Sequence, residues 1–267
     1  MLRWVGVLSL FAIASCSVVT SLDGYTGGAT PASADAGSPD ATPTPPPPAD
    51  ASTDADAGPS YRDAVLADRP IAYWPLDEKA GSLVAKDIVG NHDATLSGTA
   101  SFGVAGVAGT AFQIATSGPS LDVADAIQFT GEAPYTFECW AIPTYVDQYQ
   151  NVIQRRAGDN GYVLYFRDTG SVQLEQIWMG GIRGGWFDGP KATKFVHVVA
   201  TFDGTTLRLY VDGVQSTTTY QASGGPAAFG GGTNIGGGYA RVLDELAVYD
   251  HALTPDRVTA HHDLGAK

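Results

Sequence analysis

The stretch VHVVATFDGTTLRLYVDG, residues 196–213, carries the clearest structural pattern in this sequence. In its second half, apolar residues alternate with a cation and a tyrosine: Leu207, Leu209 and Val211 against Arg208 and Tyr210. A period of two is typical of a strand with one buried face. The pairs Asp203-Gly204 and Asp212-Gly213 tolerate the positive φ angles of tight turns. We therefore expect an antiparallel meander.

Short apolar segments of the same kind recur along the chain. The 267 residues include 33 glycines, and helical periodicity is rare. Many short strands with frequent turns predict an all-β fold, a two-sheet antiparallel jelly-roll sandwich. Besides the meander, we expect strands near residues 71–76, 111–115, 135–142, 151–154, 162–166, 172–178 and 242–249.

Two short helices are expected at the ends of this domain. Ser60 is a suitable N-cap for a helix over 61–66. The run Thr254-Pro255-Asp256 supplies the cap, the first-turn proline and the first-turn acid of a second helix. Gly265 is placed to end that helix.

The N-terminus predicts a lipoprotein signal peptide over residues 1–15. Its apolar run, Val5 to Ala14, is shorter than the roughly 20 residues of a membrane-spanning helix and is typical of a signal-peptide h-region. The run ends in IASC (13–16), which resembles the lipobox of bacterial lipoproteins. This resemblance implies cleavage before Cys16 and a diacylglycerol on its thiol. The alternative is an ordinary signal peptide that is cut elsewhere.

The predicted location is the cell envelope. Several acyl chains anchor a protein firmly, whereas one alone anchors it marginally. Ser17 follows the cysteine, and in such lipoproteins a residue other than Asp favours the outer membrane. The folded head is then either periplasmic or at the cell surface.

Residues 16–60 differ in composition from the rest of the chain. They contain PPPP at 45–48, many Ala, Ser, Thr and Asp residues, and no Lys or Arg. Such a segment cannot bury enough apolar surface to offset its ordering entropy. We expect a disordered tether, partly in polyproline conformation, that holds a single domain, residues 61–267, away from the membrane.

Charge and cysteine content argue against several functions. The formal net charge is −13 at pH 7, whereas nonspecific nucleic-acid binding requires a basic face. Beyond the N-terminal run, no apolar stretch is long enough to cross a membrane. Besides Cys16 the chain has one cysteine, Cys139, whose setting predicts a buried apolar residue of a strand.

Several segments, in order, have features of one family. They are YRDAVLADRPIAYWPLDE (61–78), DIVGNHDAT (87–95), TFECW (136–140), the meander, and DELAVYDHALTP (244–255). Together they resemble the laminin-G-like jelly-roll domains of the concanavalin A-like lectin/glucanase superfamily. The second segment is one residue shorter than the family's loop and has Ala94 in place of a glycine. The resemblance supports the jelly-roll fold, but the superfamily includes lectins, adhesion modules, glycosidases and structural domains.

No catalytic carboxylate pair is visible in the sequence. The glucanase branch of the superfamily uses a strand with alternating carboxylates, one as nucleophile and another as acid/base. The strand glutamates Glu138, Glu175 and Glu245 have no carboxylate at i+2 or i+4. The sequence also lacks a G-x-S-x-G nucleophile elbow. We therefore expect a protein that is not an enzyme.

Calcium is the expected cofactor, in a structural role. Hard cations take carboxylate, amide and carbonyl oxygens, and Asp87 and Asn91 lie in one glycine-containing loop. The family resemblance implies that Asp244 binds calcium together with carbonyls near the start of the domain. The alternative is that Asp244 is buried and satisfied by backbone N–H groups, and that the loop is an Asx-type turn.

The closing strand places Asp244 among apolar residues. In a regular strand, Val242, Asp244, Leu246 and Val248 share one face, and Glu245 points the other way. A carboxylate on a core face is costly without a metal or several donors. Asp244 is therefore predicted to be a calcium ligand or a buried cap that joins the two ends of the domain.

The run QIWMGGIRGGWFD (176–188) is the predicted ligand-binding region. It places Trp178, Arg183 and Trp186 among glycines, and sugars stack on exposed aromatic rings that polar groups assist. The alternative is that at least one of these tryptophans packs in the core. Trp74 and Trp140 are expected in the core.

Two functions remain. The first is a surface-displayed binding module for a glycan or protein partner. The second is a structural or scaffolding envelope lipoprotein without a small ligand, and a glycoside hydrolase is a distant third. We favour the first because a lone head on a long anchored tether suits capture outside the cell.

Overall fold

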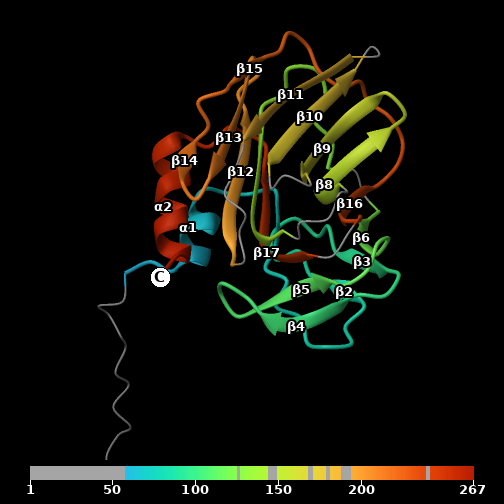
Figure 1. Cartoon of the computed structure of the whole chain (residues 1–267), viewed down its shortest axis with the longest axis vertical. Helices are drawn as coiled ribbons and strands as arrows, with labels where there is room; N and C mark the ends of the chain where they lie inside the picture. Colours follow the sequence, from blue (N-terminus) through green and yellow to red (C-terminus); the bar gives the residue numbers. More distant parts are fainter. Residues whose placement is uncertain are drawn as a thin grey trace, which may run out of the picture. The chain divides into compact units, whose positions relative to one another are not determined.

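The computed structural model describes residues 58–124, 127–143, 149–167, 171–178, 181–187, 194–238 and 241–267, with the backbone alone for 178, 181–183, 185–187 and 241. They form two antiparallel sheets with a shared core, and two short helices (Figure 1). The predicted all-β sandwich is confirmed. The predicted signal peptide, Cys16 and most of the tether lie outside the described residues.

The first sheet has nine strands in the described residues. Its path is β14-β13-β12-β7-β17-β5-β4, with β1 paired to β17 and β15 paired to β13. Because β1 pairs with β17, the start and the end of the domain lie together. The strands are β1 (Ala72–Trp74), β4 (Ser101–Ala105), β5 (Thr110–Ile114), β7 (Tyr135–Ile142), β12 (Val196–Phe202), β13 (Thr206–Val211), β14 (Val214–Gln215), β15 (Tyr220–Gln221) and β17 (Arg241–Tyr249).

The second sheet has eight strands in the same part of the chain, in the order β11-β10-β9-β8-β16-β6-β3-β2. Each segment predicted to be a strand contains one, although β11 and the short strands β2, β3, β6 and β16 of this sheet were not predicted. The strands are β2 (Val84–Ala85), β3 (Ala94–Ser97), β6 (Ser120–Val123), β8 (Gln150–Ala157), β9 (Asn160–Phe166), β10 (Val172–Trp178), β11 (Gly181–Phe187) and β16 (Thr233–Gly236).

The main core lies between the two sheets. Leu207, Leu209 and Val211 of β13 enter it, as the alternation predicted, together with side chains from β8, β9 and β10. Trp74 and Cys139 are completely buried there, as expected. In the turn after β13, Asp212 and Gly213 have φ angles of 50° and 74°, which confirms the predicted turn chemistry.

A second, smaller core lies between the first sheet and the helices α1 (Tyr61–Ala67) and α2 (Pro255–Gly265). Tyr61 of α1 and Val258 of α2 pack there with Trp140, which is 3% exposed. The predicted caps are present, because Ser60 and Thr254 accept hydrogen bonds from backbone N–H groups of the first helical turns. No helix of the described residues is long and apolar enough to span a membrane.

Glu138 of β7 fastens both helices to the sheet. Its buried carboxylate accepts hydrogen bonds from the hydroxyls of Tyr61 (3.0 Å) and Tyr249 (2.7 Å). It also lies 2.9 Å from Nε2 of His197 and 3.0 Å from Nδ1 of His261. Burial alone would raise the pKa of Glu138, but the hydrogen bonds from the two histidines hold it below its usual range. A buried charge is tolerated when hydrogen bonds satisfy it in this way.

A β-bulge in β17 overturns the predicted face of Asp244. Pairing with β7 shifts between Asp244 and Ala247, so Glu245 and Leu246 together oppose one residue. Leu246 still enters the main core. Asp244 precedes the bulge and pairs with Trp140, whose side chain lies in the helix-side core. The prediction that Asp244 shares a face with the apolar residues after it is wrong, because the extra residue reverses the alternation.

Candidate functional site

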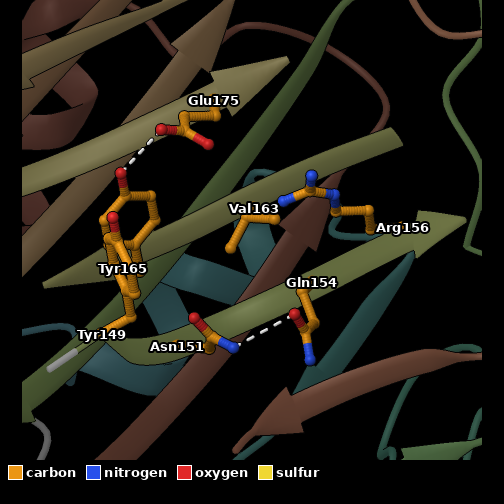
Figure 2. A pocket seen from close by; sticks show the side chains of 7 residues that line it. All are labelled: Tyr149, Asn151, Gln154, Arg156, Val163, Tyr165 and Glu175. Atoms are coloured by element: carbon orange, nitrogen blue, oxygen red, sulfur yellow. Dashed lines mark hydrogen bonds between the residues drawn. The ribbon is translucent and has the colours of Figure 1, made fainter. Parts of the chain in front are cut away.

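The outer face of the second sheet is hollowed across β8, β9 and β10 (Figure 2). The cavity measures about 290 Å³, and we call it the sheet-face hollow. Both helices pack on the first sheet, so they leave this face uncovered (Figure 1). The hollow is lined by Tyr149, Asn151, Gln154, Arg156, Val163, Tyr165 and Glu175.

Strand alternation and a bulge decide which side chains line the hollow. On β9, Val163 and Tyr165 alternate with core residues and therefore point outward. On β8, a shift of register after Asn151 sends two consecutive residues into the core. Asn151 and Gln154 consequently share the outer face, and Nδ2 of Asn151 donates to Oε1 of Gln154 at 3.1 Å.

Tyr165 and Glu175 form a polar wall of the hollow. The Tyr165 hydroxyl lies 2.7 Å from Oε1 of Glu175 and 2.7 Å from Oε1 of Gln173. One hydroxyl proton serves one acceptor at a time, and the carboxylate is the stronger acceptor. Burial raises the pKa of Tyr165, and the hydrogen bond to Glu175 raises it further. The phenol therefore stays protonated as a fixed donor.

An exposed ring and a cation complete the hollow. Tyr149 is 57% exposed, and its ring meets that of Tyr165 edge to face at a centroid distance of 5.1 Å. Arg156 is held by a hydrogen bond of 2.8 Å from Nε to the carbonyl of Gly158. Its guanidinium extends toward Val163 (Figure 2). The hollow thus combines aromatic, amide, cationic and anionic groups on one side of a rigid sheet.

The register continues this polar surface across the sheet. It aligns one residue from each of five neighbouring strands: Glu175, Val163, Gln154, Asn234 and Asp122. Nδ2 of Asn234 donates to Asp122 at 2.8 Å. The two carboxylates of the row are four strands apart, about 19 Å, whereas paired catalytic carboxylates of glycosidases lie about 5–10 Å apart.

The predicted ligand residues lie on the strands at the edge of this sheet. Trp178 ends β10, and the register pairs Arg183 of β11 with Gln176 and Trp186 with Gln173. The side chains of Trp178, Arg183 and Trp186 lie outside the described part of the chain. The aromatic platform therefore stays a prediction.

Sequence reasoning missed the residues of the sheet-face hollow. Alternation along the strands at 162–166 and 172–178 contains a signal for Tyr165 and Glu175, because both are out of phase with the core residues. The bulge that brings Gln154 beside Asn151 leaves no mark in the alternation.

Asp87 closes its own loop and presents no free oxygen. Its carboxylate accepts four backbone N–H groups at 2.9–3.0 Å, those of Tyr73, Val89, Gly90 and His92. A carboxylate has about four lone-pair positions, and these donors occupy them. Asn91 belongs to the same turn, at a φ of 64°. The arrangement is the Asx-type alternative and does not fit a calcium ligand at Asp87.

Asp244 is completely buried and keeps one oxygen unpaired. Oδ2 accepts the N–H of Val107 at 2.6 Å, and the N–H of Ala108 also favours the charged carboxylate, whereas Oδ1 has no partner in hydrogen-bond geometry among the described residues. Burial and the charge of Glu245 raise the pKa of Asp244 to about 8. A Cβ at Gly106 would lie 2.5 Å from Oδ2 of Asp244 and 2.9 Å from the Thr110 carbonyl, so these oxygens flank one glycine.

Glu245 turns to the same side of the sheet as Asp244. It has a φ of 52° in the bulge, and the hydroxyl of Tyr73, a residue of the helix-side core, donates to it. The guanidinium of Arg62 lies 3.3 Å away. Burial raises the pKa of Glu245 to about 7. The prediction that the two carboxylates point to opposite faces is wrong, and their position on one side of the sheet explains why the charge of Glu245 raises the pKa of Asp244.

The Asp244 site fits a hard cation better than the Asp87 loop does. Asp244 has a free, buried oxygen, and the Thr110 hydroxyl also lacks a partner among the described residues. In that part of the chain, no group of three or more His, Cys, Asp or Glu side chains is placed to hold a metal. Backbone carbonyls would therefore have to complete such a site.

Comparison with known proteins supports the fold. A family model described as the concanavalin A-like lectin/glucanases superfamily matches residues 115–259, more than half of the chain. No curated protein matches the chain by sequence.

Three solved structures illustrate the similarity of fold. The binding domain of botulinum neurotoxin serotype G has a TM-score of 0.58 at 11% identity, over 74% of this chain and 52% of that one. The binding domain of botulinum neurotoxin DC in complex with rat synaptotagmin II gives 0.59 at 10%, over 74% and 52%. The binding domain of Paraclostridial Mosquitocidal Protein 1 gives 0.55 at 14%, over 70% and 52%. The chain spans about half the length of these structures, and such identities show the fold alone.

Proposed function

The chain belongs to the concanavalin A-like lectin/glucanase superfamily, and on that premise we propose that it is a binding module that recognises a glycan in the sheet-face hollow. One observation carries the proposal. The hollow gathers an exposed tyrosine, two amides, a guanidinium and a carboxylate on the sheet face that the helices leave uncovered.

The chemistry of the hollow suits a sugar ring. A pyranose has apolar C–H faces and a rim of hydroxyl groups that both donate and accept. The Tyr149 ring offers a surface for the first, as aromatic side chains with one wet face do. Asn151, Gln154, Arg156 and Glu175 offer donors and acceptors for the second. A concave site with a few convergent polar groups is the usual form of a small-ligand site.

The similar toxin structures favour recognition over catalysis. Their titles call them binding domains, and one of them is in complex with a protein, rat synaptotagmin II. A protein partner is accordingly the alternative occupant. The described hollow contains one carboxylate, Glu175, and the next carboxylate of its row is four strands away. We propose that the protein is not a glycosidase.

The proposal also includes a lipid anchor that displays the domain in the cell envelope, and a structural calcium ion. A lipid on Cys16 would anchor the protein in the envelope, outer membrane included, and residues 16–60 would hold the domain at a distance from it. Calcium, if bound, would be held by Asp244, and its chemistry there would be the neutralisation of a buried carboxylate. That role is structural, because Asp244 lies on the first sheet and the sheet-face hollow on the second.

The test is a glycan array probed with the protein in the presence and absence of EDTA. We expect a reproducible hit that R156A and E175A each weaken about tenfold, which corresponds to about 1.4 kcal/mol. R208A is the matched control, because it removes a charge from the first sheet. W186A tests whether the site extends to β11.

A different result would favour the alternatives. If no glycan binds and crosslinking in the envelope captures a defined protein instead, the scaffolding role replaces the glycan proposal. If R156A and E175A bind a hit as well as the natural protein does, the glycan site lies elsewhere.

A further inference from the structure

The sheet-face hollow has an apolar floor between two opposite charges. Val163 of β9 lines the hollow and is 6% exposed. It lies opposite Glu175 of β10 on one side, and β8, the strand of Arg156, adjoins it on the other. Arg156 itself pairs with Gly161, which has no side chain, and Figure 2 shows its guanidinium extended toward Val163. The hollow thus places an acceptor, an apolar contact and a donor on three adjacent strands.

The two charged groups are held by the domain and not by each other. The Tyr165 hydroxyl lies 2.7 Å from Oε1 of Glu175, and Nε of Arg156 donates to the Gly158 carbonyl at 2.8 Å. Neither charged side chain forms an ion pair with another described residue. A ligand can therefore meet Oε2 of the carboxylate and the Nη groups of the guanidinium.

Opposite charges on the two sides of the floor select against a charged substituent. A carboxylate would be attracted by Arg156 and repelled by Glu175, and an amine would experience the reverse. A hydroxyl group donates and accepts, but it leaves the apolar surface of Val163 without an apolar partner. An N-acetyl group is neutral and offers an N–H donor, a carbonyl acceptor and a methyl group, so it matches all three side chains.

The dimensions of the hollow suit one sugar ring that carries such a group. Its volume of about 290 Å³ lies at the lower limit of small-ligand sites, which measure about 300–1,000 Å³. The exposed Tyr149 ring packs edge to face on Tyr165, and Tyr165 lies two residues, about 7 Å, along β9 from Val163. A sugar that stacks on Tyr149 can therefore extend a substituent onto the apolar floor.

On the premise of the proposed glycan function, we propose that the sheet-face hollow selects a sugar with an N-acetyl group, an N-acetylhexosamine. Glu175 accepts its amide N–H, Arg156 donates to its carbonyl oxygen, and its methyl group packs on Val163. The Tyr149 ring stacks on the sugar itself. A site that hydrogen-bonds one group of a ligand discriminates against an analogue that lacks this group.

The test is titration of the full-length protein with the methyl glycosides of N-acetylglucosamine, N-acetylgalactosamine, glucose, galactose, glucosamine and glucuronic acid. Constant ionic strength is needed because the last two sugars are charged and salt screens their attraction. We expect an N-acetylated sugar to bind about tenfold more tightly than its parent sugar and than both charged sugars. In saturation-transfer NMR, its acetyl methyl protons should receive the strongest saturation from the protein.

The variant V163T tests the apolar floor. It keeps the size of the side chain and replaces one methyl group with a hydroxyl, and we expect it to weaken binding of the N-acetylated sugar about fourfold. V214T is the matched control, because it makes the same substitution at an exposed residue of the first sheet. Thermal unfolding of both variants shows whether they remain folded.

The outcomes separate this inference from the glycan function on which it rests. If an N-acetylated sugar and its parent bind equally and R156A weakens both, the N-acetyl inference is overturned and the glycan function stands. Tightest binding of glucuronic acid also overturns the inference and assigns Arg156 to a carboxylate. Equal binding by V163T and V214T means that the methyl group does not contact the floor. If neither this panel nor the glycan array yields a ligand, both proposals fail together.

Discussion

Glu138 is the residue on which the attachment of the helices depends. Its two oxygens receive hydrogen bonds from two tyrosines and two histidines, all buried or nearly so. Removal of one partner of a buried ionic group leaves the others uncompensated. The effect of a substitution here should therefore exceed that of one at any single donor.

We expect E138Q to destabilise the domain by about 2–4 kcal/mol, because the neutral amide offers one acceptor oxygen to four donors. Y249F removes one donor and should cost about 1 kcal/mol. Urea unfolding of both variants measures the difference. Equal free energies of unfolding for E138Q and the natural protein would mean that the carboxylate contributes nothing.

Asp244 provides a test for calcium. Its free oxygen is buried and its pKa is raised to about 8, so a bound cation would stabilise the charged form. We expect millimolar calcium to raise the melting temperature of the natural protein, because a ligand of the native state alone must stabilise it. D244N should abolish the rise, whereas N91A should keep it. An unchanged midpoint in the natural protein at millimolar calcium contradicts a site there.

At the scale of single residues, the sequence predicts whether a side chain is buried more reliably than the face of the sheet to which it points. Trp74, Trp140 and Cys139 are buried as predicted, since a large apolar side chain in a strand has few alternatives. The directions of Asp244 and Glu245 were predicted wrongly. A bulge inserts one residue without a change in composition, and Glu245 adopts a positive φ with no glycine to announce it.

At the scale of elements, α2 is attached to the domain through a titratable contact. Nδ1 of His261 lies 3.0 Å from Glu138, and its Nε2 lies 3.1 Å from Asp68 at the end of α1. Burial lowers the pKa of His261, but the hydrogen bond and charge of Glu138, with the charge of Asp68, outweigh burial and raise it. Arg257, which pairs with Asp68 at 2.7 Å, opposes the rise.

This contact predicts a pH dependence of stability. Because the folded pKa of His261 lies above the unfolded value of 6.5, its stabilisation is complete below about pH 6.5 and is lost as pH rises through the folded pKa. We expect H261Q to cost more at pH 6 than at pH 9, by about 1.4 kcal/mol for each unit of the shift. Asp244 and Glu245 also destabilise the fold as pH rises, so the comparison is between H261Q and the natural protein.

Urea unfolding at the two pH values measures the effect. H262Q is the matched control on the neighbouring position, which is partly exposed and whose Nδ1 lies 3.1 Å from Asp263. An equal cost of H261Q at pH 6 and pH 9 would show that folding leaves the pKa of His261 unchanged, and a smaller cost at pH 6 would show that His261 is held neutral in the native state.

Strands, turns and helix starts are predictable where residues close together in the sequence determine them. The β12–β13 meander and both helix caps follow from alternation, turn residues and capping residues. The sheet-face hollow was not predictable as a unit, because Glu175, Tyr165 and Gln154 come from three strands. Their alignment depends on register, and on β8 the register depends on a bulge.

At the scale of the whole molecule, the two sheets have different roles. The helices cover the outer face of the first sheet and bury a second core there. The second sheet keeps a polar outer face with the sheet-face hollow. An antiparallel sheet with one solvated face is suited to present side chains from a rigid surface. The family resemblance predicted the sandwich, but which face would be free depends on where the terminal helices pack.

The anchor of the whole molecule yields the last prediction. If the thiol of Cys16 carries a diacylglycerol, the protein partitions with membranes and dissolves in detergent, because several buried acyl chains hold a protein firmly. We expect C16A to abolish this partition, while C139A, which removes the other cysteine, leaves it unchanged. Mass spectrometry of the N-terminal peptide should show the lipid in the natural protein and in C139A. A released C16A protein with an unaltered melting temperature would separate the anchor from the fold. Membrane association that survives in C16A would instead mean that the N-terminal segment is retained as an uncleaved anchor or that the domain binds the envelope itself.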